Sequence, residues 1–307
     1  MFSAILRLIR FQNLGIIVLT QALMYFFIIV PFAQKNGIIL SMDIRELILV
    51  VLSTVLIAAG GYIINDYFDI RIDRINRPLK VIVDSFIERR IAIAAHIVIT
   101  ALALLIAGLV AYKTGKLWLG ILQVISAGLL WFYSTDLKYR FLAGNLAIAF
   151  LTALVPMLVL FYSFTFDFYD GINLLKPSLI ITGFSFFAFL ATVVREITKD
   201  IEDYEGDKVY GCRTLPVRFG MQKSRIFAVI LTLLIIGMLG MVQSFFLESG
   251  KMYHVAYLFI LLQIPFLIFI YRLMKAKTPA GFHSVNTLLK LIMLAGLFFA
   301  LTYSGQV

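Results

Sequence analysis

Hydrophobic positions occur along the chain in nine long runs, which short polar segments separate. Each run is long enough to cross, or nearly cross, a bilayer as a helix, because about 20 apolar residues span the hydrocarbon core. The pattern therefore predicts an all-α integral membrane protein with nine transmembrane helices. The runs cover approximately residues 13–33, 47–65, 91–112, 117–133, 142–162, 178–195, 224–246, 252–271 and 287–304.

A first polar cluster follows the second apolar run. Asn65, Asp69 and Asp73 are spaced at i, i+4 and i+8, so they share one face if the helix continues past the run. An amide and two carboxylates on one face favour a hard divalent cation such as Mg²⁺. The basic residues that follow suit a phosphate group: Arg71, Arg74, Arg77 and Lys80.

A second polar cluster follows the sixth apolar run. Asp200, Asp203 and Asp207 are spaced at i, i+3 and i+7, which predicts one helical face here as well. Arg195 and Lys199 lie among these acids. Nine of the 17 acidic residues of the chain fall in the two short clusters, and this concentration is the main functional signal.

Composition supports a membrane location. With 62% hydrophobic and 14% charged residues, the chain is too apolar for an ordinary soluble protein. A net charge of +10 would suggest nucleic acid as a partner of a soluble protein, but here basic residues mark cytoplasmic loops that contact lipid headgroups. The single cysteine, Cys212, excludes an intramolecular disulfide and offers no thiolate metal site. The three histidines (His96, His254 and His283) show no metal-ligand spacing.

The distribution of basic residues predicts the orientation in the membrane. Of 27 Lys and Arg residues, 21 fall on the side that holds the N-terminus. The positive-inside rule then places the N-terminus in the cytoplasm and the C-terminus outside. Both acidic clusters are expected on the cytoplasmic side, at the ends of membrane spans, where the topology allows them to face one another across a central cavity.

Two acidic clusters beside a membrane-embedded cavity suit the ionisation of an allylic isoprenyl diphosphate. Mg²⁺ held by the clusters would neutralise the leaving diphosphate, and Arg77, Lys80 and Lys199 would bind its oxygens. An apolar, aromatic-rich tunnel would hold the prenyl chain and exclude water from the allylic cation.

The two motifs resemble those of the UbiA superfamily of intramembrane prenyltransferases. The resemblance rests on Asn65-x3-Asp69-x3-Asp73 with Arg74-Ile75-Asn76-Arg77-Pro78, and on Arg195-Glu196-x2-Lys199-Asp200-x2-Asp203-x3-Asp207. Further similar positions are Tyr133-Ser134, Lys138, Gly144-Asn145, the segment Gly211–Pro216, and Lys290. The resemblance covers nearly the whole chain, so it implies one domain over residues 1–307. It also implies nine helices around a central cavity, with a cap over the cytoplasmic mouth.

The resemblance also implies a set of functional residues. Mg²⁺ is expected on Asn65, Asp69, Asp73, Asp200, Asp203 and Asp207, of which Asp69, Asp73, Asp203 and Asp207 are expected to be catalytic. The isoprenyl diphosphate and the lipophilic acceptor are expected to contact Asn65, Arg74, Arg77, Lys80, Tyr133, Lys138, Arg195 and Lys199. One departure from the family pattern is the segment 79–86, where many members carry a second Arg-Pro and a Pro-Ser-Gly.

The residues of the second motif, Lys199–Asp207, and of the segment Cys212–Pro216 indicate the acceptor by resemblance. This sequence is most similar to the branch of the family that adds a geranylgeranyl group to geranylgeranylglyceryl phosphate in membrane lipid biosynthesis. An aromatic acceptor of quinone biosynthesis (dihydroxynaphthoate, hydroxybenzoate or homogentisate) is the alternative.

Two other functions are less consistent with the sequence. A CDP-alcohol phosphotransferase would carry Asp-Gly-x2-Ala-Arg, which the chain lacks. A divalent-cation carrier would place repeated acidic motifs on the exit face, but the outer loops contain only five scattered acidic residues: Asp43, Glu46, Asp167, Asp170 and Glu248.

Overall fold

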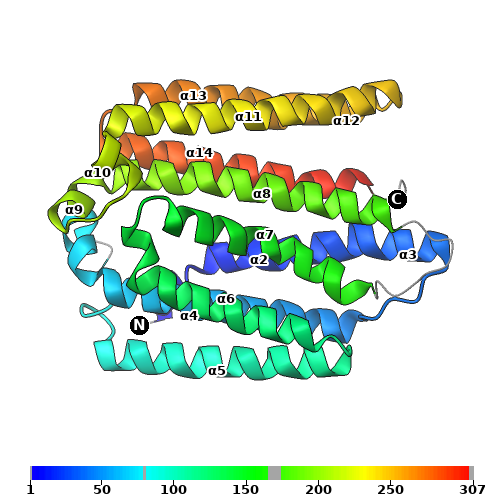
Figure 1. Cartoon of the computed structure of the whole chain (residues 1–307), viewed down its shortest axis with the longest axis horizontal. Coiled ribbons are helices and arrows are strands. Elements are labelled where there is room, and N and C mark those ends of the chain that lie inside the picture. The colour runs from blue at the N-terminus through cyan, green and yellow to red at the C-terminus, as the bar shows by residue number, and fades with distance from the viewer. Residues whose placement is uncertain (1, 79–80, 165–173, 304–307) are drawn as a thin grey trace. The chain divides into compact units, whose positions relative to one another are not determined.

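The structure is a computed structural model that describes residues 2–78, 81–164 and 174–303. Within these residues it is helical and contains no β-strand, and nine helical segments are long and apolar enough to cross a membrane (Figure 1). The prediction of an all-α membrane protein with nine spans is therefore confirmed. The spans are α2–η1–α3 (Phe11–Met24, Tyr25–Ile29, Val30–Asn36), α4 (Ile44–Asn76), α5 (Arg89–Lys113), α6 (Leu117–Thr135), α7 (Ala143–Ser163), α8 (Leu175–Glu202), α11 (Met221–Glu248), α12–η4–α13 (Met252–Leu258, Phe259–Gln263, Ile264–Lys275) and α14–η5 (Pro279–Phe298, Phe299–Tyr303).

Shorter helices lie between or before the spans. They are α1 (Phe2–Leu8), η3 (Leu137–Tyr139), α9 (Tyr204–Val209) and α10 (Leu215–Phe219). The chain divides into two compact units. The first contains Met1–Lys138 and Leu154–Thr182, and the second contains Tyr139–Ala153 and Gly183–Gln306. The predicted central cavity and cytoplasmic cap stay predictions.

Helix α4 extends well beyond its apolar run. Its first turn carries a capping box, in which the Asp43 carboxylate accepts from the backbone N–H groups of Arg45 and Glu46, and Glu46 accepts from the N–H of Asp43. At the other end the helix continues to Asn76 and stops before Pro78, because proline disfavours helical backbone in the residue that precedes it. Asn65, Asp69 and Asp73 therefore lie on a continuous helix, as their spacing predicts.

In the first unit, α4 packs against α5 and α6 (Figure 1). Two adjacent glycines allow the close approach. A Cβ on Gly61 would lie 2.8 Å from a methyl carbon of Leu130, and a Cβ on Gly60 would lie 2.5 Å from Oγ1 of Thr100. The carbonyl of Gly60 also contacts Nδ1 of the buried His96 at 2.9 Å. Small residues at helix contacts are typical of membrane proteins, and His96 packs at this contact between α4 and α5.

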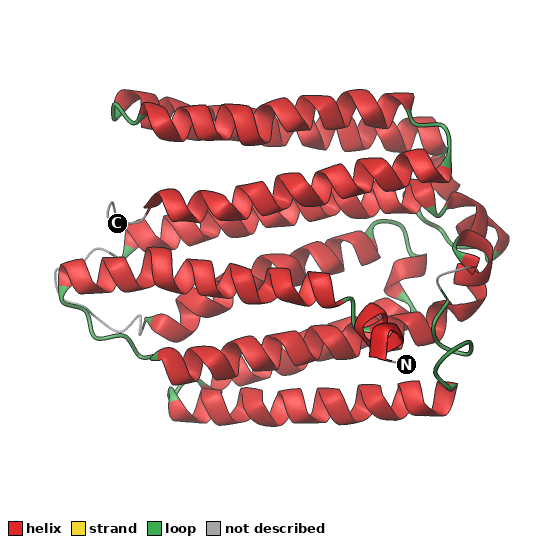
Figure 2. Cartoon of the chain, turned by 180° about the vertical axis from the view of Figure 1, so that it is seen from behind, coloured by secondary structure: helices red, strands yellow, loops and turns green. Residues whose placement is uncertain are grey.

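Helix α1 packs against the polar end of α4. In Figure 2 it lies beside the N label, across the direction of the long helices. Its buried residues form one apolar cluster with α4, with the turn after α4 and with the start of α5: Ala4, Leu8, Ile63, Ile70, Ile82, Val83, Ile87 and Ala92. This cluster holds the N-terminal helix close to the first acidic motif.

The second unit has a separate apolar core. Phe266 and Phe269 of α13 and Phe282 and Leu289 of α14 are almost fully buried there. Ile197 and Ile201 at the end of α8 belong to the same core. The packing therefore fixes the polar end of α8, which carries the second acidic motif, against the helices of its own unit.

Candidate active site

The first acidic motif forms a compact polar cluster on α4. The side-chain amide of Asn65 donates to Oδ2 of Asp69 at 2.8 Å, and the ammonium of Lys138 lies 2.5 Å from Oδ1 of the same carboxylate. Asn65 is buried, and the side chains of Asp69 and Lys138 are only 18% and 9% exposed. Each oxygen of Asp69 therefore has a donor from a different part of the first unit.

The side-chain oxygen of Asn65 is an unsatisfied acceptor. Its Oδ1 atom is buried and has no hydrogen-bond partner among the residues that the structure describes. A buried polar atom of this kind costs free energy unless a ligand or water satisfies it. An amide oxygen next to a carboxylate on the same helical face is an oxygen donor set of the kind that Mg²⁺ binds.

A second ion pair lies on the same stretch of α4. The guanidinium of Arg10 lies 2.9 Å from Oδ1 of Asp66 and 4.8 Å from the centre of the Tyr62 ring. Burial lowers the pKa of Arg10 and the Asp66 carboxylate raises it, and the net direction is upward. Arg10 therefore keeps its positive charge. Arg10 is not among the predicted site residues, because nothing local in the sequence indicates a partner 56 positions away.

The basic residues after the first motif have mixed placements. Arg74 pairs with Asp84 at 2.8 Å, and Arg89 contacts the same carboxylate at 3.4 Å. Arg77 caps the end of α4 through its backbone N–H, which donates to the carbonyl of Asp73. Lys80 lies outside the described residues.

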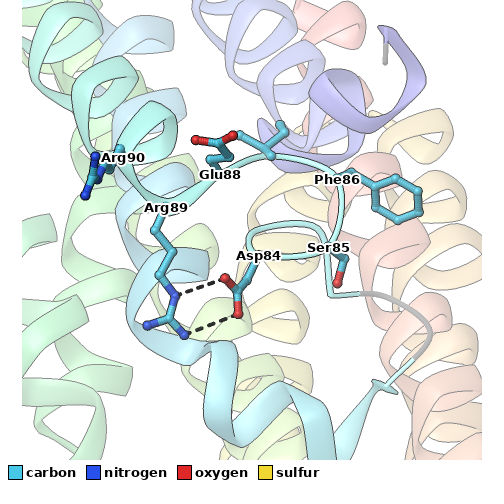
Figure 3. Close-up of a pocket in the computed structure, with 7 residues that line it drawn as sticks. Asp84, Ser85, Phe86, Glu88, Arg89 and Arg90 are labelled. Atoms are coloured by element: carbon cyan, nitrogen blue, oxygen red, sulfur yellow. Dashed lines mark hydrogen bonds and ion pairs between the residues drawn. The ribbon is translucent and has the colours of Figure 1, made fainter.

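The described part of the segment that departs from the family pattern forms a tight turn. Backbone hydrogen bonds join residues 82–87, and a hollow of about 400 Å³ is lined by residues 84–90. Figure 3 shows Arg89 turned toward Asp84, whereas Phe86 and Arg90 point away from it. Within the part of the chain that the structure describes, no residue predicted to bind metal or diphosphate lines this hollow.

The second acidic motif lies at a break between two helices. Helix α8 ends at Glu202 and α9 begins at Tyr204, with Asp203 between them in a non-helical conformation (φ −91°, ψ 7°). The prediction that Asp200, Asp203 and Asp207 share the face of one continuous helix is therefore wrong. Spacings of three and four also fit a helix that stops and restarts, and aspartate is a favoured residue at such a restart.

The acids of the second motif have polar partners inside the second unit. Oδ2 of Asp200 accepts from the amide of Asn145 at 2.8 Å. The buried Asp207 accepts from the hydroxyl of Thr214 at 3.2 Å. Arg195 donates to Glu196, its neighbour in the chain, at 3.0 Å. Lys199 is half-buried on the last turns of α8.

Glu202 lies between two residues of α14. Its oxygens contact Nδ1 of His283 at 3.2 Å and the amide of Asn286 at 2.8 Å. The sequence places Glu202 among the clustered acids, but no local pattern indicates its contacts with His283 and Asn286. These contacts join the end of α8 to the first turns of the last span.

The residues of the first motif fit a magnesium ion by their chemistry. The donors are amide and carboxylate oxygens, and one of them is buried without a partner. Among residues 2–78, 81–164 and 174–303, no three or more His, Cys, Asp or Glu side chains gather closely enough to hold a metal by themselves. Asp69 and Asp200 instead meet Lys138 and Asn145, which supply positive charge and N–H donors to these carboxylates.

Comparison with known proteins gives consistent matches over most of the chain. The model of the UbiA prenyltransferase family matches residues 22–294. The digeranylgeranylglyceryl phosphate synthase of Saccharolobus solfataricus is 32% identical over 263 residues, covering 83% of this chain and 84% of the relative. That of Methanosphaera stadtmanae is 33% identical over 254 residues, covering 81% and 84%.

Solved structures of similar proteins have the same fold. A structure described as digeranylgeranylglyceryl phosphate synthase is 26% identical, with a TM-score of 0.63 and coverage of 98% of this chain and 99% of that one. A UbiA homologue from Archaeoglobus fulgidus bound to DMAPP and Mg²⁺ is 18% identical, with a TM-score of 0.59 and coverage of 97% and 99%.

Proposed function

The chain belongs to the UbiA prenyltransferase family, and from this premise we propose that it transfers a geranylgeranyl group from its diphosphate to geranylgeranylglyceryl phosphate in a Mg²⁺-dependent reaction. The membership makes it a multi-pass membrane prenyltransferase. Support for the acceptor comes from the relatives at 32–41% identity that are named digeranylgeranylglyceryl phosphate synthase.

The observation that carries the magnesium proposal is the unsatisfied side-chain oxygen of Asn65. It is buried and lies on the side chain that donates to Asp69, on the helical face that also carries Asp73. We assign Asn65, Asp69 and Asp73 as metal ligands, and Asp200, Asp203 and Asp207 as ligands from the second motif. UbiA homologues have been solved with Mg²⁺ and with DMAPP or GPP, which supports a metal–diphosphate site in the family.

When bound, Mg²⁺ would neutralise charge on the diphosphate and make it a better leaving group. Basic and hydroxyl side chains would hold the diphosphate oxygens through charge-assisted hydrogen bonds. They are those of Arg74, Arg77, Lys80, Tyr133, Lys138, Arg195 and Lys199. The bond between C1 of the prenyl chain and the diphosphate oxygen breaks, and the electron pair leaves with the diphosphate. The hydroxyl oxygen of the acceptor then bonds to C1 and gives up its proton to the departing diphosphate.

A transfer assay tests class and acceptor together. Protein purified in detergent is incubated with Mg²⁺ and radiolabelled geranylgeranyl diphosphate, with geranylgeranylglyceryl phosphate, dihydroxynaphthoate or hydroxybenzoate in parallel tubes. We expect label on the glyceryl phosphate, lost on chelation of the metal and in Asp69→Ala. Label on an aromatic ring would keep the reaction and overturn the acceptor. Failure to transfer label or to release diphosphate, with prenyl chains of several lengths, would overturn the proposed reaction.

The orientation of the chain is part of the proposal. With 21 of 27 basic residues on one side, the N-terminus and both acidic motifs are assigned to the cytoplasm. Single cysteines in place of the exposed Lys113 and Lys208 test this in a Cys212→Ser background. A membrane-impermeant maleimide added to intact cells should label position 113 and not position 208. The reverse pattern would invert the topology.

A further inference from the structure

Arg10 occupies a backbone conformation that glycine usually fills. It lies between α1 and α2 with φ 51° and ψ 53°, in the left-handed region. Its N–H donates to the carbonyl of Arg7 at 3.0 Å, and its carbonyl accepts from the N–H of Asn13 at 2.7 Å, so it ends one helix and begins the next. Residues with a Cβ are strained in this region. An arginine here indicates a requirement for its side chain rather than for the turn.

The side chain of Arg10 holds one carboxylate of the first motif. Its guanidinium bonds to Asp66 and covers the ring of Tyr62, one turn earlier on α4. At 3.6 residues per turn, Asp66, Asp69 and Asp73 fall within an arc of about 60° on this helix. Asp66 is thus a third carboxylate on the face that carries the assigned metal ligands.

A third carboxylate on that face is a competing ligand. Divalent cations bind more tightly as the number of carboxylate ligands increases. Tight binding by a ligand set that includes Asp66 would move the ion away from Asn65, whose side-chain oxygen is the buried, unsatisfied acceptor. The ion pair with Arg10 occupies Oδ1 of Asp66 and offsets its charge.

We propose that Arg10 is a positioning residue that keeps Asp66 out of the metal-ligand set, so that the ion binds at Asn65, Asp69 and Asp73. The inference rests on the proposed function, because it takes these three residues as the ligands. It assigns a role to the N-terminal helix as well, since the packing of α1 on α4 places Arg10 at Asp66.

The test uses Arg10→Gly, which removes the side chain and also relieves the backbone strain. Binding of Mn²⁺ in the presence of inorganic pyrophosphate is measured by electron paramagnetic resonance, beside Mg²⁺-dependent prenyl transfer. Because a carboxylate is released into the site, we expect Mn²⁺ to bind roughly fivefold to tenfold tighter while kcat falls about tenfold or more. Damage to the fold would instead weaken Mn²⁺ binding.

The double variant Arg10→Gly/Asp66→Asn should return both values to within about twofold of the wild type, because the competing carboxylate is gone. Arg7→Gln is the matched control, since Arg7 is exposed and bonds only within its own helix at Ser3. Asp66→Asn alone should bind Mn²⁺ as the wild type does, and this variant keeps the test valid if Arg10→Gly does not fold.

Two results would overturn the inference: unchanged Mn²⁺ affinity and kcat in Arg10→Gly, or loss of Mn²⁺ binding in Asp66→Asn, which would make Asp66 a ligand. A wild type that transfers no prenyl group but shows the expected Mn²⁺ pattern would refute the proposed function and leave the role of Arg10 standing. Normal prenyl transfer by the wild type, without the expected changes in Mn²⁺ binding in the variants, would refute the role of Arg10 and leave the proposed function standing.

Discussion

The ammonium of Lys138 lies 2.5 Å from Oδ1 of Asp69, although 69 positions separate the two residues in the chain. Both side chains are largely buried. The carboxylate that is assigned to hold a divalent cation is thus neutralised in this structure by a cation of the protein itself. A metal ion bound by Asp69, as proposed, would compete with Lys138 for this carboxylate.

Lys138→Met should destabilise the metal-free protein by about 3 kcal/mol, because it leaves the largely buried Asp69 carboxylate without a positively charged partner. Mg²⁺ can then supply the missing charge. We therefore expect Mg²⁺ to raise the melting temperature of the variant more than that of the wild type. Thermal unfolding in detergent, with and without Mg²⁺, measures both effects. Lys223→Met, at an exposed position of α11, is the control. An equal response to Mg²⁺ in variant and wild type would contradict the competition.

Asn145→Asp should make prenyl transfer strongly dependent on the Mg²⁺ concentration. The substitution places a second carboxylate at the amide position 2.8 Å from Asp200, and like charges at that distance repel. We expect about a 100-fold loss at low Mg²⁺ and partial recovery at high Mg²⁺, because bound metal offsets the repulsion. Asn145→Leu also loses the hydrogen bond but adds no charge, so its activity should not recover with Mg²⁺. Initial rates across a Mg²⁺ series distinguish the two variants, and parallel losses would refute the argument.

The sequence was sufficient to predict elements that depend on local pattern. The nine apolar runs correspond to nine helices, within the described residues, that are long and apolar enough to span a membrane, and the spacing of Asn65, Asp69 and Asp73 correctly indicated that α4 continues past the apolar run. The same reasoning failed at Asp203. A spacing of three and four residues fits a continuous helix and an interrupted one equally well, and the residues beside Asp203 include no proline or glycine to mark a break.

Partners that are distant in sequence could not be predicted in this way. The sequence indicated Lys138 and Asp69 separately, but it did not indicate that they form an ion pair. The left-handed backbone of Arg10 had no sequence signal, because such positions usually carry glycine. The contact of Glu202 with His283 and Asn286 depends on the packing of α8 and α14 in the second unit.

Lys116→Met should destabilise the first unit, and the effect should grow as the pH rises. The buried ammonium of Lys116 donates to three carbonyls at 2.8–2.9 Å. Those of Phe161 and Tyr162 lie in the last turn of α7, and that of Phe164 directly follows the helix. Removing the ammonium takes away the buried donor that these three carbonyls share, which costs about 2 kcal/mol at pH 7.

The pH dependence follows from the burial of Lys116, which lowers the pKa of its side chain from 10.5 to about 8. Between these two values the unfolded state binds more protons than the folded state, so the free energy of unfolding of the wild type rises with pH. The total gain across the window is roughly 3 kcal/mol at most. Thermal unfolding at pH 7.0 and 9.5 should therefore show a widening gap between wild type and Lys116→Met. Lys113→Met, exposed at the end of α5, should follow the wild type. A gap that narrows would show that the folded-state pKa is not lowered.

Gly61→Ala should weaken the packing of α4 on α6, whereas Gly108→Ala on α5 should be neutral or stabilising. A Cβ at position 61 would lie 2.8 Å from Cδ1 and 3.2 Å from Cδ2 of Leu130, so the helices or the leucine must shift. Overpacking of this kind costs about 1–3 kcal/mol. Nothing lies within 4 Å of a Cβ at position 108, where alanine gains about 0.5–1 kcal/mol over glycine in a helix. Melting temperatures of the two variants should therefore move in opposite directions from the wild type.

The polar end of α4 carries Asn65 and Asp69, one and two turns beyond Gly61. Gly61→Ala should therefore also lower Mg²⁺-dependent transfer, and Leu130→Ala, which makes room for the added methyl, should restore both properties. A Gly61→Ala protein as stable and active as the wild type would show that this contact does not fix the register of α4.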